Sequence, residues 1–188
     1  MVQNRDKALF EIILALERGP LHVRALSRKI SLPHSTVIRA LSELEKEHAV
    51  DYNIIGKNKE YFLMNNVYAR AFFIMAEQYN LLKIVRKYPK TAPIIKDILS
   101  GHNKGIVAIF GSHAKGSANN DSDIDIYAET KDSGVKKSIE LINSRISVKT
   151  GAFDANSLLI REIIKFHVLI SGAEEFYEKM RASFKNKI

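Results

Sequence analysis

Cysteine is absent from this chain of 188 residues, which excludes disulfide bonds, thiolate metal sites and a thiol nucleophile. Long hydrophobic runs are lacking too, because no apolar stretch approaches the roughly 20 residues that span a bilayer. The first residues do not show the basic and then apolar layout of a signal peptide. We therefore expect a cytoplasmic protein without a membrane partner.

Acidic residues are outnumbered, with 21 against 29 Lys and Arg, and the formal net charge is +8. The excess lies mainly in residues 66–104, which hold seven basic and two acidic residues, whereas residues 1–65 hold ten and eight. A basic segment attracts polyanions without specifying which kind. A solvated helix face would show the same composition, so charge alone does not assign a partner.

The first 65 residues predict three helices followed by a β-hairpin. Apolar residues recur at helical spacing in three short segments that are separated by proline-containing turns. Ser35 and Thr36 are expected to cap the third helix. Two β-rich runs, residues 50–55 and 60–64, are joined by a basic loop that begins with Gly56.

This order of elements resembles a winged helix-turn-helix of bacterial and archaeal regulators. The stretch Ser-Thr-Val-Ile-Arg-Ala-Leu-Ser-Glu-Leu-Glu-Lys is typical of its recognition helix, one face of which enters the major groove. The resemblance implies double-stranded DNA as a partner, with phosphate contacts from the hairpin loop. The residues that it singles out are Ser35, Thr36, Arg39, Lys57 and Lys59. Winged helices also serve as protein-interaction or dimerisation modules, so a homodimer stays open.

The strongest chemical pattern lies between residues 105 and 128. An apolar strand over residues 105–110 leads into Gly-Ser-His-Ala-Lys-Gly-Ser, and a second, alternating strand begins at Asp123. Residues two apart in a strand face the same side, so Asp123 and Asp125 should project together with Cα atoms about 6.6 Å apart. Such a pair suits a hard divalent cation, Mg²⁺ or Mn²⁺. The glycine–serine turn offers N–H groups and a hydroxyl to a phosphate, and Lys115 offers a positive charge.

Two better-known phosphate motifs are excluded. A P-loop fails because Ser117 stands where its lysine belongs, and a Rossmann fingerprint fails because the third glycine is missing. The composite of strand, Gly-Ser-x-Ala-x-Gly and Ser-Asp-x-Asp resembles instead the minimal nucleotidyltransferases of the polymerase-β superfamily. That resemblance covers residues 93–172. It implies that Asp123 and Asp125 are catalytic metal ligands and that Gly111, Ser112 and Lys115 bind the triphosphate of an NTP.

One departure from that family bears on catalysis. The family usually carries a third carboxylate on the following strand, and our alignment places Lys149 at or near that position, with Asp154 as the nearest acid. Whether the chain is an enzyme is therefore open. It could transfer a nucleoside monophosphate to a protein, nucleic acid or small molecule. It could also be a DNA-binding regulator that senses nucleotide without turnover, or an antitoxin-type protein that modifies or masks a partner.

The expected fold class is α+β in three parts. Residues 1–65 form the winged helix-turn-helix, residues 66–92 a helical connector, and residues 93–188 a nucleotidyltransferase-like α/β domain with a small mixed sheet. The connector is predicted because residues 67–88 show a helical apolar pattern without internal proline. Pro89 and Pro93 then bracket a break before the next helix.

Overall fold

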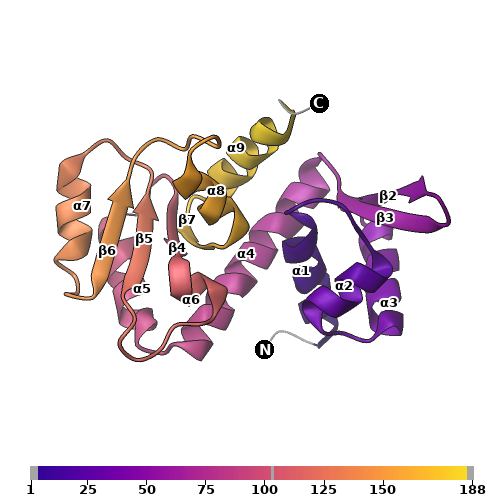
Figure 1. The fold of residues 1–188 in the computed structure, drawn as a ribbon, viewed down its shortest axis with the longest axis horizontal. Helices are drawn as coiled ribbons and strands as arrows, with labels where there is room; N and C mark the ends of the chain where they lie inside the picture. Colours follow the sequence, from indigo (N-terminus) through magenta and orange to yellow (C-terminus); the bar gives the residue numbers. More distant parts are fainter. Residues whose placement is uncertain (1–3, 103, 186–188) are drawn as a thin grey trace. The chain divides into compact units, whose positions relative to one another are not determined.

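The protein is described by a computed structural model that covers residues 4–102 and 104–185, and its fold is mixed α+β (Figure 1). The chain forms two compact units, one ending at Tyr79 and the other starting at Asn80. The long helix α4 (Val67–Lys87) supplies residues to both. No helix among the described residues has both the length and the apolar character that a membrane span requires.

The first unit combines short helices with a small antiparallel sheet. Its helices before α4 are α1 (Asn4–Leu16), α2 (Val23–Ile30) and α3 (His34–Lys46). Its strands are β1 (Leu21–His22), β2 (Val50–Ile55) and β3 (Asn58–Leu63), in the order β1-β3-β2. The three short helices contact one another around the fully buried side chains of Ile12, Leu26 and Leu41. Burying these apolar faces is what makes such short helices stable, since isolated helices of this length are marginal in water.

The start of α3 differs from the expectation. The helix begins at His34 after Pro33, and no side chain caps its first turn. Pro33 occupies the N-cap position, and its carbonyl accepts from the N–H of Val37 at 3.1 Å, so the helix begins without a capping hydroxyl. Ser35 and Thr36 therefore lie within the first turn and do not cap it.

The hairpin is also tighter than expected. Lys59 belongs to strand β3, and the turn consists of Gly56 and Lys57 alone. Gly56 has a φ of 61°, a conformation that glycine adopts without strain. The two strands can therefore pair up to Ile55 and Asn58, and Lys59 lies on the ladder instead of in a loop.

The second unit is built on a mixed four-stranded sheet. Its strands are β4 (Val107–Phe110), β5 (Ile124–Ala128), β6 (Ile146–Thr150) and β7 (Val168–Ser171), in the order β6-β5-β4-β7. The pair β5 and β6 is parallel, and the other two pairs are antiparallel. Its helices after α4 are α5 (Thr91–Gly101), α6 (Gly111–Lys115), α7 (Ser133–Glu140), α8 (Leu158–Lys165) and α9 (Ala173–Lys185).

The two faces of this sheet have different roles. One face joins α4, α5 and α7 in a hydrophobic cluster that includes Ile124 and Ile126 of β5. Side chains alternate along a strand, so Asp125 and Tyr127 project to the opposite face. There the Tyr127 hydroxyl donates a hydrogen bond of 3.0 Å to the carbonyl of Gly151. The apolar residues of β5 thus bind the strand to the core and leave Asp125 on the other side.

The proline-containing break before α5 is shorter than expected. Pro93 lies in the first turn of α5, because the helix begins at Thr91. Proline is tolerated there, since the first N–H groups of a helix have no partner within it.

Candidate active site

Asp125 lies where strands β4 and β5 bring the two parts of the motif together. It pairs with Phe110, the last residue of β4, and Gly111 follows directly. Gly111 has a φ of 66°, and a Cβ atom at this position would overlap Oδ2 of Asp125. Glycine alone among the amino acids combines this backbone conformation with so close an approach. The motif needs its first glycine because the main chain touches the Asp125 carboxylate.

Asp123 is exposed and lies immediately before β5. Burial raises the pKa of the Asp125 carboxyl above its ordinary value, and the negative charge of Asp123 raises it further. The nearby His113 and Lys149 partly offset this increase, because each lowers the pKa of Asp125. The two aspartates therefore lie close enough for the charge of Asp123 to act on the Asp125 carboxyl. A cation between them would relieve that repulsion.

The glycine–serine segment forms a short helix, α6, where a loop was expected. Gly116, with a φ of 72°, ends this helix. The N–H of Ser117 then donates to the carbonyl of Ser112 at 2.9 Å, which folds the segment back on itself. Gly111 and Ser112 begin the helix, where backbone N–H groups lack intrahelical acceptors. These two residues thus present donors next to Asp125.

Lys115, predicted to contact phosphate, forms an ion pair with Glu162 of α8, with 2.7 Å between Nζ and Oε1. The exposed fractions of the Lys115 and Glu162 side chains are 40% and 43%. A pair this exposed contributes at most about 1 kcal/mol, so the ammonium can leave it at little cost. Glu162 also raises the pKa of Asp125. Sequence reasoning did not single out Glu162, because no local pattern links it to a lysine 47 positions earlier.

The register of β6 decides which residue lies beside Asp125. Ser147 pairs with Asp125, whereas Lys149 pairs with Tyr127. The position next to Asp125 on this strand is thus a serine, and Lys149 lies two residues farther along the strand, on the same face. Strand β6 carries no acidic residue, and Asp154 lies beyond its end in a turn, where its Oδ1 accepts from the N–H of Asn156.

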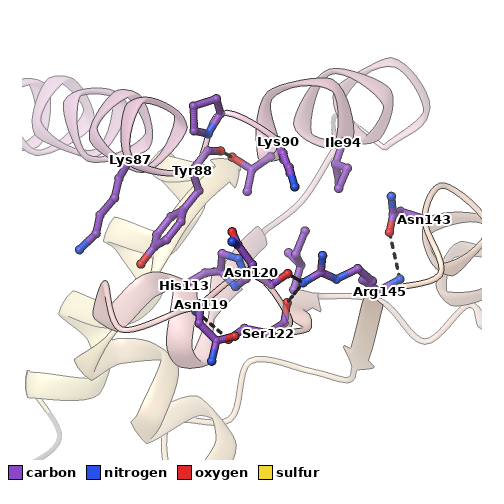
Figure 2. Close-up of a pocket in the computed structure, with 13 residues that line it drawn as sticks. Lys87, Tyr88, Lys90, Ile94, His113, Asn119, Asn120, Ser122, Asn143 and Arg145 are labelled. Atoms are coloured by element: carbon purple, nitrogen blue, oxygen red, sulfur yellow. Dashed lines mark hydrogen bonds between the residues drawn. The ribbon is translucent and has the colours of Figure 1, made fainter.

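A second residue that the sequence did not reveal is Arg145. Its guanidinium donates to the backbone carbonyls of Asn120 and Ser122, as Figure 2 shows. Within that loop the N–H of Asn119 donates to the Ser122 hydroxyl at 2.9 Å. Arg145 thus braces the segment that leads into Asp123. A single arginine 22 residues after an aspartate gives no sequence signal of such a role.

The residues predicted to contact DNA lie in the first unit. Ser35 and Arg39 are exposed on α3, and Thr36 is half-buried beside them. Lys57 and Lys59 are exposed on the hairpin. The Lys59 ammonium lies 3.6 Å from the centre of the Tyr52 ring, and a hydrogen bond with Tyr52 raises its pKa. Lys59 therefore stays charged at neutral pH on the strand next to the turn.

The segment that contains both aspartates and the glycine–serine helix is similar to a known family. Residues 90–181 match the family model of the nucleotidyltransferase domain. The matched segment includes the whole mixed sheet and both strands of the motif. No curated protein is significantly similar to the chain.

A solved structure described as "Crystal structure of the toxin-antitoxin with AMP-PNP" shares 17% sequence identity with the chain. The match covers 57% of this chain and 86% of that chain, with a TM-score of 0.33. A likeness at this level assigns neither a fold nor a partner to this chain.

Proposed function

We propose that the nucleotidyltransferase domain transfers a nucleoside monophosphate from an NTP to an acceptor hydroxyl. The observation that carries this proposal is the contact of the Gly111 backbone with the Asp125 carboxylate, with Asp123 beside it. In the reaction the acceptor oxygen bonds to the α-phosphorus as the bond to the bridging oxygen breaks. Pyrophosphate leaves, and the proton of the attacking hydroxyl passes to solvent. The acceptor belongs to a protein, a nucleic acid or a small molecule.

The donor set suits Mg²⁺ or Mn²⁺. The two neighbouring carboxylates offer hard oxygen ligands, and burial and the charge of Asp123 together raise the pKa of Asp125. When bound, such a cation neutralises triphosphate charge and orients the attack on the α-phosphorus. Asp123 and Asp125 would hold it, and the N–H groups and hydroxyl of Gly111 and Ser112 would orient the phosphates. Lys115 would leave Glu162 to meet the incoming negative charge.

The test is transfer of label from NTPs that carry it on the α-phosphate, with Mg²⁺ and total cell lysate as the source of acceptor. We expect Asp123→Asn and Asp125→Asn to abolish labelling. Asp97→Asn is the matched control, because Asp97 is an exposed carboxylate on α5. The proposal is wrong if a variant that carries both Asp123→Asn and Asp125→Asn labels acceptors as strongly as the unmodified protein.

A second function, nucleotide sensing without turnover, is favoured by one observation. The residue beside Asp125 on β6 is Ser147, so no third carboxylate stands there to activate the acceptor. On this alternative the protein is a DNA-binding regulator or an antitoxin-type partner, and its nucleotide site only binds. Calorimetry would then show Mg²⁺-dependent NTP binding that both aspartate variants lose, with no label transferred to any acceptor.

We propose further that the first unit is a winged helix-turn-helix that binds double-stranded DNA. Support comes from the exposed residues Ser35 and Arg39 on α3 and from Lys57 and Lys59 on a tight hairpin. Phosphate contacts make affinity fall steeply as salt rises. A mobility-shift assay should show weaker binding for Arg39→Ala with Lys57→Ala, and unchanged binding for Lys137→Ala, an exposed lysine of α7. If duplex DNA does not bind at low salt, the unit has another role.

A further inference from the structure

A pocket of about 220 Å³ lies in the second unit, bordered by the turn between α4 and α5, the loop before Asp123 and the segment before β6 (Figure 2). Ile124 lines it, so it opens on the side of β5 opposite to Asp125. Pockets for drug-sized ligands measure about 300–1,000 Å³. This one suits a single chemical group of a larger molecule.

The charged side chains that line this pocket are all cationic. Lys87 and Lys90 approach from the α4–α5 turn, Arg145 approaches from the start of β6, and none of the described lining residues is acidic. Lys87 donates to the carbonyl of Gly116 at 2.6 Å, and Arg145 donates to the loop carbonyls. An ammonium has three donors and a guanidinium five, so these bonds leave further donors on both groups. Lys90 is exposed at the rim.

Two buried polar atoms at the pocket wall have no hydrogen-bond partner. They are Nδ1 of His113, a residue only 5% exposed, and the hydroxyl oxygen of Tyr88. The two rings meet edge to face with 5.0 Å between their centres. A buried polar atom that lacks a hydrogen-bond partner lowers the stability of the folded state. Both residues line the pocket, and because the two atoms themselves are closed off from solvent, a ligand group bonds to them only when the ring turns toward it.

We propose that this pocket is a phosphate-binding site for a second molecule, separate from the NTP held by the aspartates. A phosphate oxygen accepts a hydrogen bond from Lys90, and a second one from the Tyr88 hydroxyl when that ring turns toward the pocket. Its negative charge matches the three cations. The site lies across β5 from the nucleotide site but shares the loop that leads into Asp123. Its occupant therefore lies against the loop that leads into Asp123.

The experiment is calorimetry of inorganic phosphate binding to the full chain, at fixed ionic strength, with EDTA and without NTP. Lys90→Gln should weaken binding about tenfold and Tyr88→Phe about threefold, the scale of one charged and one neutral hydrogen bond. Lys96→Gln is the matched control, because Lys96 is an exposed lysine of α5 outside the pocket. Tyr88→Phe should fold normally, since the hydroxyl that it removes has no partner. Absence of phosphate binding, or equal binding in all three variants, would overturn the site.

A second arm identifies the source of the phosphate. With Mg²⁺ and NTP present, inorganic phosphate should still bind, with one site for each ligand. If NTP instead expels it, the pocket takes a phosphate of the NTP and the proposed second molecule is wrong. Asp125→Asn should abolish Mg²⁺-dependent NTP binding and leave phosphate binding unchanged. Failure of the nucleotidyltransferase proposal can thus be told apart from failure of this one.

Discussion

The main chain of Gly111 lies directly against the carboxylate of Asp125, at a point where a Cβ atom would overlap Oδ2. Gly111→Ala should lower the free energy of unfolding by about 1–2 kcal/mol from the left-handed backbone alone. The overlap adds to this cost and should displace Asp125, so Mg²⁺-dependent NTP binding should also be lost. Urea denaturation and calorimetry measure the two effects.

The control for this prediction is Gly101→Ala. Gly101 ends α5, lies outside the left-handed region and has open space where a Cβ would be. We expect this variant to be as stable as the unmodified protein or slightly more stable, since alanine restricts the unfolded chain. Equal effects at both glycines would show that the contact with Asp125 is unimportant.

The register of β6 makes a prediction about the third carboxylate. Ser147→Asp places an acid beside Asp125 and should increase Mg²⁺ affinity in the presence of a non-hydrolysable NTP. Lys149→Asp places it beside Tyr127 and should have a smaller effect. Transfer of label should rise in the same order. A larger gain from Lys149→Asp would show that the register at the site differs in the nucleotide complex.

The ion pair of Lys115 with Glu162 predicts opposite effects for its two members. Lys115→Met removes a positive charge and should weaken NTP binding, whereas Glu162→Gln releases Lys115 and should strengthen it. Each change should alter the free energy of unfolding by less than about 1 kcal/mol, because the pair is exposed. Should Glu162→Gln instead abolish Mg²⁺-dependent binding, Glu162 would be the missing metal ligand.

Tyr127 predicts how stability depends on alkaline pH. Burial, and to a smaller extent Glu129, raises the pKa of the Tyr127 phenol well above its ordinary value of 10.0. The folded protein therefore keeps a proton that the unfolded chain releases, and stability falls as pH rises above that ordinary value. Tyr127→Phe should cost about 1 kcal/mol at pH 7 through the lost bond to Gly151.

The same variant should lose less stability than the unmodified protein between neutral and strongly alkaline pH, as measured by urea denaturation. Tyr68→Phe, which alters an exposed tyrosine of α4, should change neither the stability at pH 7 nor its loss at alkaline pH. Parallel stability curves for Tyr127→Phe and the unmodified protein would contradict the prediction.

The spacing of apolar residues along the sequence correctly predicted elements whose residues follow a regular apolar pattern. Helix α4 starts at the expected residue, Val67, and β2 matches its expected range, because both carry a regular apolar pattern. The expectation that Ser35 and Thr36 cap α3 was wrong. Pro33 takes the N-cap position, which a rule based on side-chain hydroxyls does not consider. Strand β1 escaped notice because its two residues become a strand only by pairing with β3.

The motif located the aspartates and the glycine, but the residues around them come from distant parts of the chain. Arg145 braces the loop before Asp123, and Glu162 holds Lys115, through contacts that depend on how β6 and α8 pack. No spacing in one sequence encodes such contacts. The displacement of Lys149 from the expected position has the same cause, since register follows from strand pairing in three dimensions.

Strand β6 ends the mixed sheet, since β5 is its one neighbour in the described order. An edge strand has unpaired backbone groups that can add strands from other chains, and a charged side chain on it, lysine above all, opposes this. Lys149 is exposed on that strand among Ile146, Val148 and Thr150, which all favour β structure. Its charge would then keep copies of this protein from joining edge to edge. An aspartate there would preserve solubility, whereas Lys149→Ile should cause concentration-dependent association detectable by light scattering.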